Sequence, residues 1–397
     1  MKRGIVLLIL LGVPCPALPC PVLACGLCCT SRQPTLRQEA AQASAVVYGT
    51  LANPRQGRDG QGNATPKDID GTTDLFIEQS IKTHPALAGM KRLELQRYVT
   101  IDPKQPRFLI LFDIQNGKVD PYQGFPATPA VVDYLQGMLA INPKDTHRIL
   151  AHAFRHLEHP DPTIAGDAFR EFEFAEYGDY RAFARTLLPD QLARWLADPQ
   201  TTTHRRGLYA FLLGHCGSAR DARLLRDFLD NPSKRQISGL DRVLLGYLML
   251  QPKEGWEFIQ GLLSDARGDF LERYAALRAV RFLWETRPDL VPRHQLFDAV
   301  CTLLDQSDIA DLVVEDLRKW GRWDALGRVL ALEKQQEFWD IPIMRRAVIR
   351  FALSCPQPAA AAFVQRMRKQ LPELVQDQEE SLKLEAKLEA EEQTRRN

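Results

Sequence analysis

The sequence predicts an α+β chain of several domains, in which a small antiparallel β-barrel precedes a long array of paired helices. Residues 45–127 contain short apolar segments separated by turn signals, which is typical of antiparallel strands. Residues 128–372 instead place apolar residues three and four positions apart, which is typical of helices that bury one face. The expected divisions of the chain are residues 1–24, 25–44, 45–127, 128–372 and 373–397.

The composition is that of a folded protein without a strong charge bias. Of 397 residues, 45% are hydrophobic and 25% are charged, and the 51 basic residues nearly balance the 50 acidic ones. This length is enough for about two or three domains. Because a nucleic-acid-binding domain usually carries a basic surplus, we expect a protein partner and no nucleic-acid partner.

Four segments of the β region have strand patterns, and we expect four or five strands in all. They are residues 45–51, 73–81, 91–99 and 107–114. Asn116-Gly117 follows the last of them and is a hairpin-turn signal. Residues 56–71 have almost no apolar content, which predicts a long exposed hairpin loop between the first two strands.

The helical region repeats itself. Short Asp-containing turns recur at intervals of about 32 to 40 residues, and a helical pattern lies on each side of them. These turns lie at Asp161, Asp198, Asp230, Asp265, Asp305 and Asp340. Because one helical pair cannot bury its apolar stripe alone, such units stack into an α-solenoid.

The spacing and the Asp-Pro turns resemble those of HEAT repeats over about residues 145–370. In that family an Asp in the turn and an Arg early in the next helix often form a ladder between repeats. The matching pairs are Asp198 with Arg205, Asp265 with Arg273, and Asp340 with Arg345 or Arg346. The resemblance implies a solenoid of HEAT-like helical pairs that offers a curved surface to a protein partner.

Residues 1–24 are typical of an export signal. Lys2 and Arg3 precede an apolar run over residues 5–11, and prolines interrupt the segment after it. The run is too short to span a bilayer, and no later stretch approaches the length that a span needs, so we expect no transmembrane helix in the mature chain. The predicted location is exported: periplasmic, cell-surface or secreted.

Two processing routes are open at Ala24-Cys25. The residues Val22-Leu23-Ala24-Cys25 fit a signal-peptide cleavage site, and they also resemble a bacterial lipobox, in which the cysteine carries a lipid. Cys25 is therefore a lipidation candidate. That lipid anchor is the only membrane contact we expect.

The segment before the β region holds Cys25, Cys28 and Cys29 and leads into Val-Val-Tyr-Gly at residues 46–49. A cysteine cluster before such a strand resembles the netrin-like family, which includes tissue inhibitors of metalloproteinases, over residues 25–125. The resemblance implies an OB-like barrel and, as an alternative function, protease inhibition through the N-terminal domain. This chain has Cys-x-x-Cys-Cys and no further cysteine in the β region, so the family's disulfides into the barrel cannot form.

The three cysteines leave several interpretations open. Cys25 with Cys28 or Cys29 would close a small disulfide loop, so all three are disulfide candidates. A metal site is a second interpretation, but structural zinc needs about four ligands and the next histidine is His84. A redox pair is a third, although such pairs normally open a helix in a fold of alternating strands and helices.

A histidine cluster lies in one predicted helix. His152 and His156 are four residues apart and share a face, and His159 follows near the helix end. One hypothesis is a zinc site. The other is a polar helix edge at which a histidine interacts with the C-terminal end of the helix dipole. Apart from that zinc, we expect no cofactor.

Two tryptophans and the C-terminal tail are the remaining candidates for partner binding. Trp320 and Trp323 lie between two predicted helices. Aromatic residues are enriched at interaction hot spots, so both are interaction candidates, with burial in the helical core as the alternative. Residues 373–397 are highly charged and are expected to be a solvated helix, a disordered tail or a helix that binds a partner.

These features predict an exported, non-enzymatic interaction or scaffold protein whose helical solenoid presents a protein-binding surface. A metal-dependent hydrolase or metal-binding protein that uses His152, His156 and His159 is the first alternative. Protease inhibition through the N-terminal domain is the second.

Overall fold

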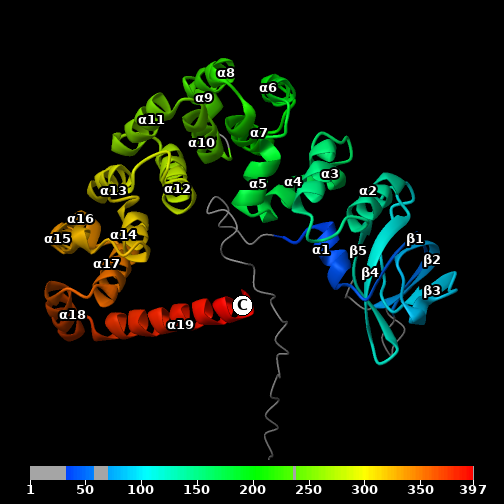
Figure 1. Ribbon diagram of the computed structural model, residues 1–397. Coiled ribbons are helices and arrows are strands. Elements are labelled where there is room, and N and C mark those ends of the chain that lie inside the picture. Colours follow the sequence, from blue (N-terminus) through cyan, green and yellow to red (C-terminus); the bar gives the residue numbers. More distant parts are fainter. Residues whose placement is uncertain (1–32, 58–69, 236–237, 397) are drawn as a thin grey trace, which may run out of the picture. The chain divides into compact units, whose positions relative to one another are not determined.

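The computed structural model describes residues 33–57, 70–235 and 238–396 (Figure 1). A five-stranded antiparallel sheet lies in the N-terminal region, and helices follow it to the end of the chain, which confirms the α+β prediction. The chain divides into two compact units after Thr302. The predicted export signal and the three clustered cysteines, Cys25, Cys28 and Cys29, lie outside the described residues.

The sheet has the strand order β3-β2-β1-β4-β5, and every neighbouring pair is antiparallel. The strands are β1 (Ala45–Gln56), β2 (Gly71–Lys82), β3 (Arg92–Leu95), β4 (Arg107–Gln115) and β5 (Lys118–Pro126), with a short 3₁₀ helix η1 (Pro85–Leu87) between β2 and β3. Asn116 and Gly117 have φ angles of 52° and 77°. Two successive positive φ angles are what a tight hairpin turn requires, so the turn prediction is confirmed.

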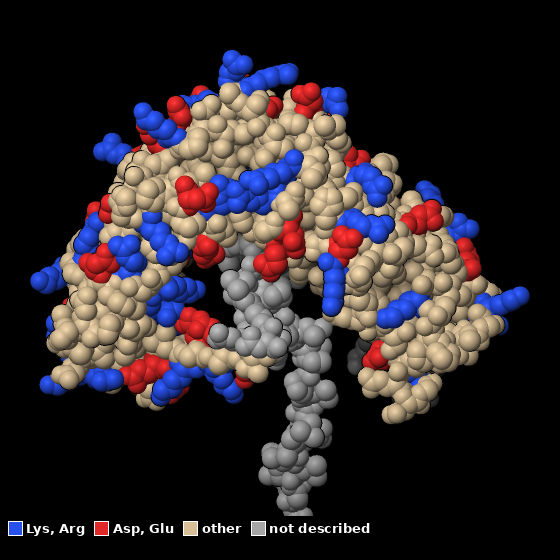
Figure 2. Space-filling view, in the orientation of Figure 1, with Lys and Arg blue, Asp and Glu red and all other residues tan. Residues whose placement is uncertain are grey.

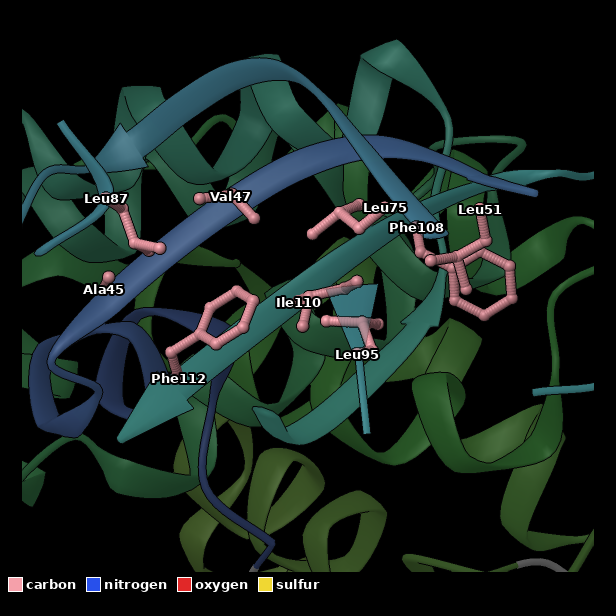
Figure 3. Close-up of a cluster of buried hydrophobic side chains, with 9 residues drawn as sticks. All are labelled: Ala45, Val47, Leu51, Leu75, Leu87, Leu95, Phe108, Ile110 and Phe112. Atoms are coloured by element: carbon pink, nitrogen blue, oxygen red, sulfur yellow. The ribbon is translucent and has the colours of Figure 1, made fainter. Parts of the chain in front are cut away.

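Both faces of the sheet are buried, which explains the unbroken apolar run of β4. Phe108, Ile110 and Phe112 point into the main cluster of buried side chains, whereas Leu109 and Leu111 are buried on the opposite face. A strand covered on both sides loses the alternation of apolar and polar residues. Figure 3 shows the nine buried members of the cluster: Ala45, Val47, Leu51, Leu75, Leu87, Leu95, Phe108, Ile110 and Phe112.

Helices occupy the rest of the first unit. They are α1 (Leu36–Gln42), α2 (Pro129–Leu139), α3 (Thr146–His156), α4 (Pro162–Phe174), α5 (Tyr177–Ala184), α6 (Pro189–Ala197), α7 (Thr203–Cys216), α8 (Ala219–Leu229), α9 (Pro232–Arg235), α10 (Leu240–Leu250), α11 (Pro252–Ser264), α12 (Phe270–Thr286) and α13 (Arg293–Cys301). Several begin at a proline, whose fixed φ suits the first helical position and whose missing N–H is not needed there. The Asp-Pro turns in the sequence therefore mark helix boundaries.

The second unit is helical throughout its described residues. It contains α14 (Ala310–Lys319), α15 (Leu326–Ala331), α16 (Gln336–Trp339), α17 (Pro342–Ser354), α18 (Pro358–Gln370) and α19 (Pro372–Arg396), with the 3₁₀ helices η2 (Thr302–Asp305), η3 (Trp323–Ala325) and η4 (Leu332–Lys334) at and after the boundary. The charged tail is thus a helix. Glu385 of α19 accepts hydrogen bonds from Arg318 of α14 at 2.7 Å and from Arg350 of α17 at 2.5 Å, so α19 is tied to two other helices.

Ion pairs join parts of the first unit that are far apart in the sequence. They are Glu158–Arg205 at 3.4 Å, Glu173–Arg242 at 3.8 Å and Asp241–Arg278 at 3.0 Å. The resemblance to HEAT repeats implied a contact between Asp198 and Arg205. Arg205 instead pairs with Glu158, and the carboxylate of Asp198 accepts the backbone N–H of Gln200 within its own turn.

Helices α7 and α10 approach each other at glycines. A Cβ on Gly246 would lie 2.2 Å from the carbonyl oxygen of Ala210, and one on Gly214 would lie 2.7 Å from the Cα of Gly246. Both distances are far below van der Waals contact, so the two backbones pack where only glycine fits.

Helix α1 was not predicted, although its sequence contains a capping box. The Thr35 side chain accepts the N–H of Gln38, and the Gln38 side chain accepts the N–H of Thr35. At its first turn the N–H of Leu36 donates to Asp167 of α4 at 2.7 Å, and at its last turn Lys82 of β2 donates to the carbonyl oxygen of Ala41 at 2.8 Å. Helix α1 therefore lies between the sheet and the helices.

We predict that Gly246→Ala lowers the free energy of unfolding by about 1–3 kcal/mol, because its new methyl group forces α7 and α10 apart. Gly261→Ala is the matched control, because Gly261 lies in the interior of α11 with nothing within 4 Å of its built Cβ. This second change should raise the unfolding free energy by up to about 1 kcal/mol. Urea denaturation followed by circular dichroism measures both, and equal effects would refute the close approach.

Candidate functional site

The predicted histidine cluster forms at the end of α3. The rings of His152 and His156 lie 4.6 Å apart between centroids, and those of His156 and His159 lie 6.1 Å apart. Tyr134 of α2 packs with its ring centroid 5.0 Å from that of His156. The three histidine rings therefore lie near one another, and their role as metal ligands stays a prediction.

One ring nitrogen of His156 and one of His159 contact backbone groups. Nδ1 of His156 lies 2.8 Å from the carbonyl oxygen of His152, and Nδ1 of His159 accepts the N–H of Asp161 at 3.0 Å. Burial lowers the pKa of His152 to about 4, with His156 and Arg155 as smaller causes, so that ring is neutral near pH 7. Across the described parts of the chain, no three His, Cys, Asp or Glu side chains are arranged to hold a metal ion.

Trp320 and Trp323 are half-buried in the second unit. The ring of Trp323 packs edge-on against Phe351 of α17 with the centroids 5.2 Å apart, and its carbonyl oxygen accepts a hydrogen bond from Gln357 at 3.2 Å. Trp320 is the C-cap of α14. Part of each ring is accessible, so their role in binding stays a prediction.

A hydrogen-bonded chain that the sequence did not reveal joins α5, α7 and the end of α12. Nδ1 of His215 lies 2.8 Å from the carbonyl oxygen of Phe211, which only accepts, so Nδ1 carries the proton. The other nitrogen, Nε2, must then accept, and the hydroxyl of Tyr177 donates to it at 3.1 Å. Arg287 donates to the same hydroxyl oxygen at 3.1 Å. Each hydrogen bond of this chain therefore has a defined donor and acceptor.

The charge state of this chain follows from its surroundings. Burial is the main reason that the pKa of His215 is lowered to about 4; the hydrogen bond to Phe211 opposes the shift, and the cations Arg287, Arg181 and Arg185 add to it. Asp289 holds the guanidinium of Arg287 through two contacts at 2.7 and 2.8 Å. His215 is therefore neutral, while Arg287 is charged and fixed in place.

Cys216, next to His215, has no such activation. Its thiol donates to the carbonyl oxygen of Leu212 at 3.5 Å, and burial raises its pKa to about 11. A thiolate is the nucleophilic form of cysteine, so this thiol is unreactive near pH 7. Cys301 and Cys355 are buried free thiols.

Arg181, Arg185 and Arg287 form what we call the α5 basic cluster. Arg181 lies on α5 and Arg185 is its C-cap residue, one turn further on, and neither has an ion-pair partner within the described residues. The charges of all three arginines lower the pKa of His215, and that of Arg181 also lowers the pKa of Asp289. Leu188, one turn further on, is 72% exposed. Elsewhere, basic and acidic side chains lie next to each other over much of the face drawn in Figure 2.

No sequence pattern predicts the hydrogen-bonded chain of Tyr177, His215 and Arg287. Tyr177 and Arg287 are 110 positions apart and His215 lies on a third helix, so only the packing of α5, α7 and α12 brings them together.

Comparison with protein-family models, curated proteins and solved structures found no match for the chain. Among the described helices, none has the length and apolar character needed to cross a membrane, as expected from the sequence.

We predict that His215 makes stability depend on pH. Its pKa is about 4 in the folded chain and about 6.5 when unfolded. The unfolded state therefore binds more protons between these values, and stability is lost as the pH falls from 6.5 to 4. In His215→Gln the slope of unfolding free energy against pH in this window should decrease by up to about 1.4 kcal/mol per pH unit.

The measurement is urea denaturation at several pH values between 4 and 7. Part of the slope should remain in the variant, because burial also lowers the pKa of His152 to about 4. His294→Gln is the control, since His294 is exposed on α13. A His215→Gln slope equal to that of the wild type would contradict the neutral, buried state of this ring.

Proposed function

We propose that this chain is an exported, non-enzymatic binding protein, in which α3–α13 form a HEAT-like solenoid that presents a protein-binding surface. The ion pairs Glu158–Arg205, Glu173–Arg242 and Asp241–Arg278 support a stack of helices, because each joins one part of the helical region to a later part. In such a stack each unit contacts its neighbours, and the exposed helix faces together make an extended surface.

The α5 basic cluster is the observation that carries this proposal. Two arginines without ion-pair partners in the described chain lie beside a third whose position is fixed by Asp289 and Tyr177. Arginine and tyrosine are enriched at the energetic centres of protein interfaces, and fixed side chains lose little entropy on binding. An exposed leucine one turn away adds apolar area. Charge complementarity favours an acidic segment of a partner protein.

For the N-terminal domain we propose an OB-like barrel, as the netrin-like resemblance implies. The order β3-β2-β1-β4-β5 leaves β3 and β5 at the two ends of the sheet. In a flat sheet these strands would be about 19 Å apart, at roughly 4.8 Å per strand. Yet Leu95 of β3 and Val119 of β5 belong to one apolar cluster, which supports a sheet rolled toward closure.

The two alternative functions stay predictions. A zinc hydrolase would need at least three ligands near one another, and no such group of His, Cys, Asp or Glu side chains is found among the described residues. Protease inhibition would involve the residues around Cys25, which lie outside the described chain. No specific observation favours either of them.

The test is a pull-down from the envelope fraction of the source cells with the tagged full chain. We expect the wild type to retain a protein that Arg181→Glu/Arg185→Glu retains at least tenfold less well. Binding should also weaken when salt is raised, because exposed charges are screened over about 8–10 Å at physiological ionic strength.

Arg345→Glu/Arg346→Glu is the matched control, because it reverses two arginines of α17 that likewise have no ion-pair partner within the described residues. It should retain the same protein as the wild type. If both double variants behave alike, or if the wild type retains nothing beyond an unrelated tagged protein, the proposed surface is wrong.

A further inference from the structure

A cavity of about 490 Å³ lies where the sheet meets the helices of the first unit. Its walls come from Thr50 of β1, from the segment before and at the start of β4, from the end of β5, and from the starts of α2 and α4. Pockets for small molecules usually measure about 300–1,000 Å³. The volume therefore suits one small ligand.

The walls of this cavity are rigid. Four prolines line it, namely Pro106, Pro126, Pro129 and Pro162, and each has a fixed φ angle. The two helix starts are tied together, because the hydroxyl of Thr128 donates to Asp161 at 2.9 Å. A ligand would thus enter a preformed space and need little ordering of the protein.

Two cationic side chains line the cavity, and the carboxylate of Glu78 lies next to one of them. Lys104 and Arg107 line it, and Asp161 is the one acidic residue among the described lining residues. Both oxygens of Asp161 are engaged, one by the hydroxyl of Thr128 and the other by the N–H of Thr163 at 2.9 Å. Lys104 has no ion-pair partner in the described chain, and Arg107 pairs with Glu78 at 3.3 Å.

The remaining lining is apolar or weakly polar. The four pyrrolidine rings and Ala127 provide apolar surface, and the hydroxyl of Thr50 donates to Glu78 at 2.5 Å. Tyr48, two residues before Thr50 on the same face of β1, is 4% exposed. An apolar wall with cations on one side fits a ligand that has an apolar body and one negative group.

We propose that this cavity binds a small organic anion, such as an aromatic or aliphatic carboxylate or sulfonate, with Lys104 and Arg107 holding its charged group. The inference goes beyond the proposed function, since the cavity shares no residue with the α5 basic cluster. Either can be correct when the other is wrong.

The experiment titrates the full chain with 8-anilinonaphthalene-1-sulfonate, an apolar anion whose fluorescence rises in apolar surroundings. We expect saturable binding near one site per chain. Lys104→Glu should weaken it about tenfold or more and Arg107→Ala by several fold, because each removes attraction for the sulfonate. The uncharged analogue N-phenyl-1-naphthylamine should bind the wild type and Lys104→Glu with affinities within about twofold of each other.

Lys253→Glu is the matched control. Lys253 lines a different cavity, of about 450 Å³, between α11 and α13, and its charge reversal should leave the affinity unchanged. Gln105→Trp, which fills the proposed cavity, should abolish binding of both dyes. Absence of saturable binding would overturn the proposal. So would a Lys104→Glu variant that binds the sulfonate as tightly as Lys253→Glu does.

Discussion

The attachment of α1 at both of its ends is the constraint on which the arrangement of the first unit depends. A helix carries partial positive charge at its N-terminus and partial negative charge at its C-terminus. Asp167 of α4 accepts the N–H of Leu36 at the first end, and Lys82 of β2 donates to the last carbonyl groups at the other. A seven-residue helix thus joins the sheet to the helices through charges of the favourable sign.

Asp167 extends this junction to a third element. Burial raises the pKa of Asp167, which the N–H of Leu36, Arg170 and the hydroxyl of Tyr134 oppose. Tyr134 of α2 donates to its second oxygen at 2.9 Å. Arg37 of α1 pairs with Glu171 at 2.9 Å, one turn further along α4. Removing one partner from such a buried group costs about 3–5 kcal/mol, because it leaves a charge uncompensated.

The same junction sets the geometry of the cavity. Helices α2 and α4 begin at its wall, and they are joined once by Thr128–Asp161 and again, further in, by Tyr134–Asp167. Further ion pairs join Glu173 of α4 to Arg242 of α10, and Asp241 of α10 to Arg278 of α12. A series of polar contacts thus links the sheet region, through α2 and α4, to α10 and α12.

Local signals in the sequence were enough to predict the antiparallel strands and the helical region, because each signal depends on a few neighbouring residues. The Asn116-Gly117 turn and the prolines at helix starts are examples. Thr35 and Gln38 have the spacing of a capping box, which is the local signal for α1. Which acidic residue pairs with a given arginine could not be predicted in this way. The repeat pattern suggested Asp198 for Arg205, but the packing of α7 places Arg205 next to Glu158.

The two candidate surfaces differ in what would make them selective. The chain is nearly neutral, with 51 basic and 50 acidic residues, and side chains of both signs are mixed over the face drawn in Figure 2. Arg181, Arg185 and Lys104 have no ion-pair partner within the described chain. Exposed arginines attract an acidic partner over a long range but lose that attraction in salt. Lys104 acts beside rigid apolar walls, where a ligand keeps its contact area whatever the salt concentration, so shape as well as charge would decide what binds there.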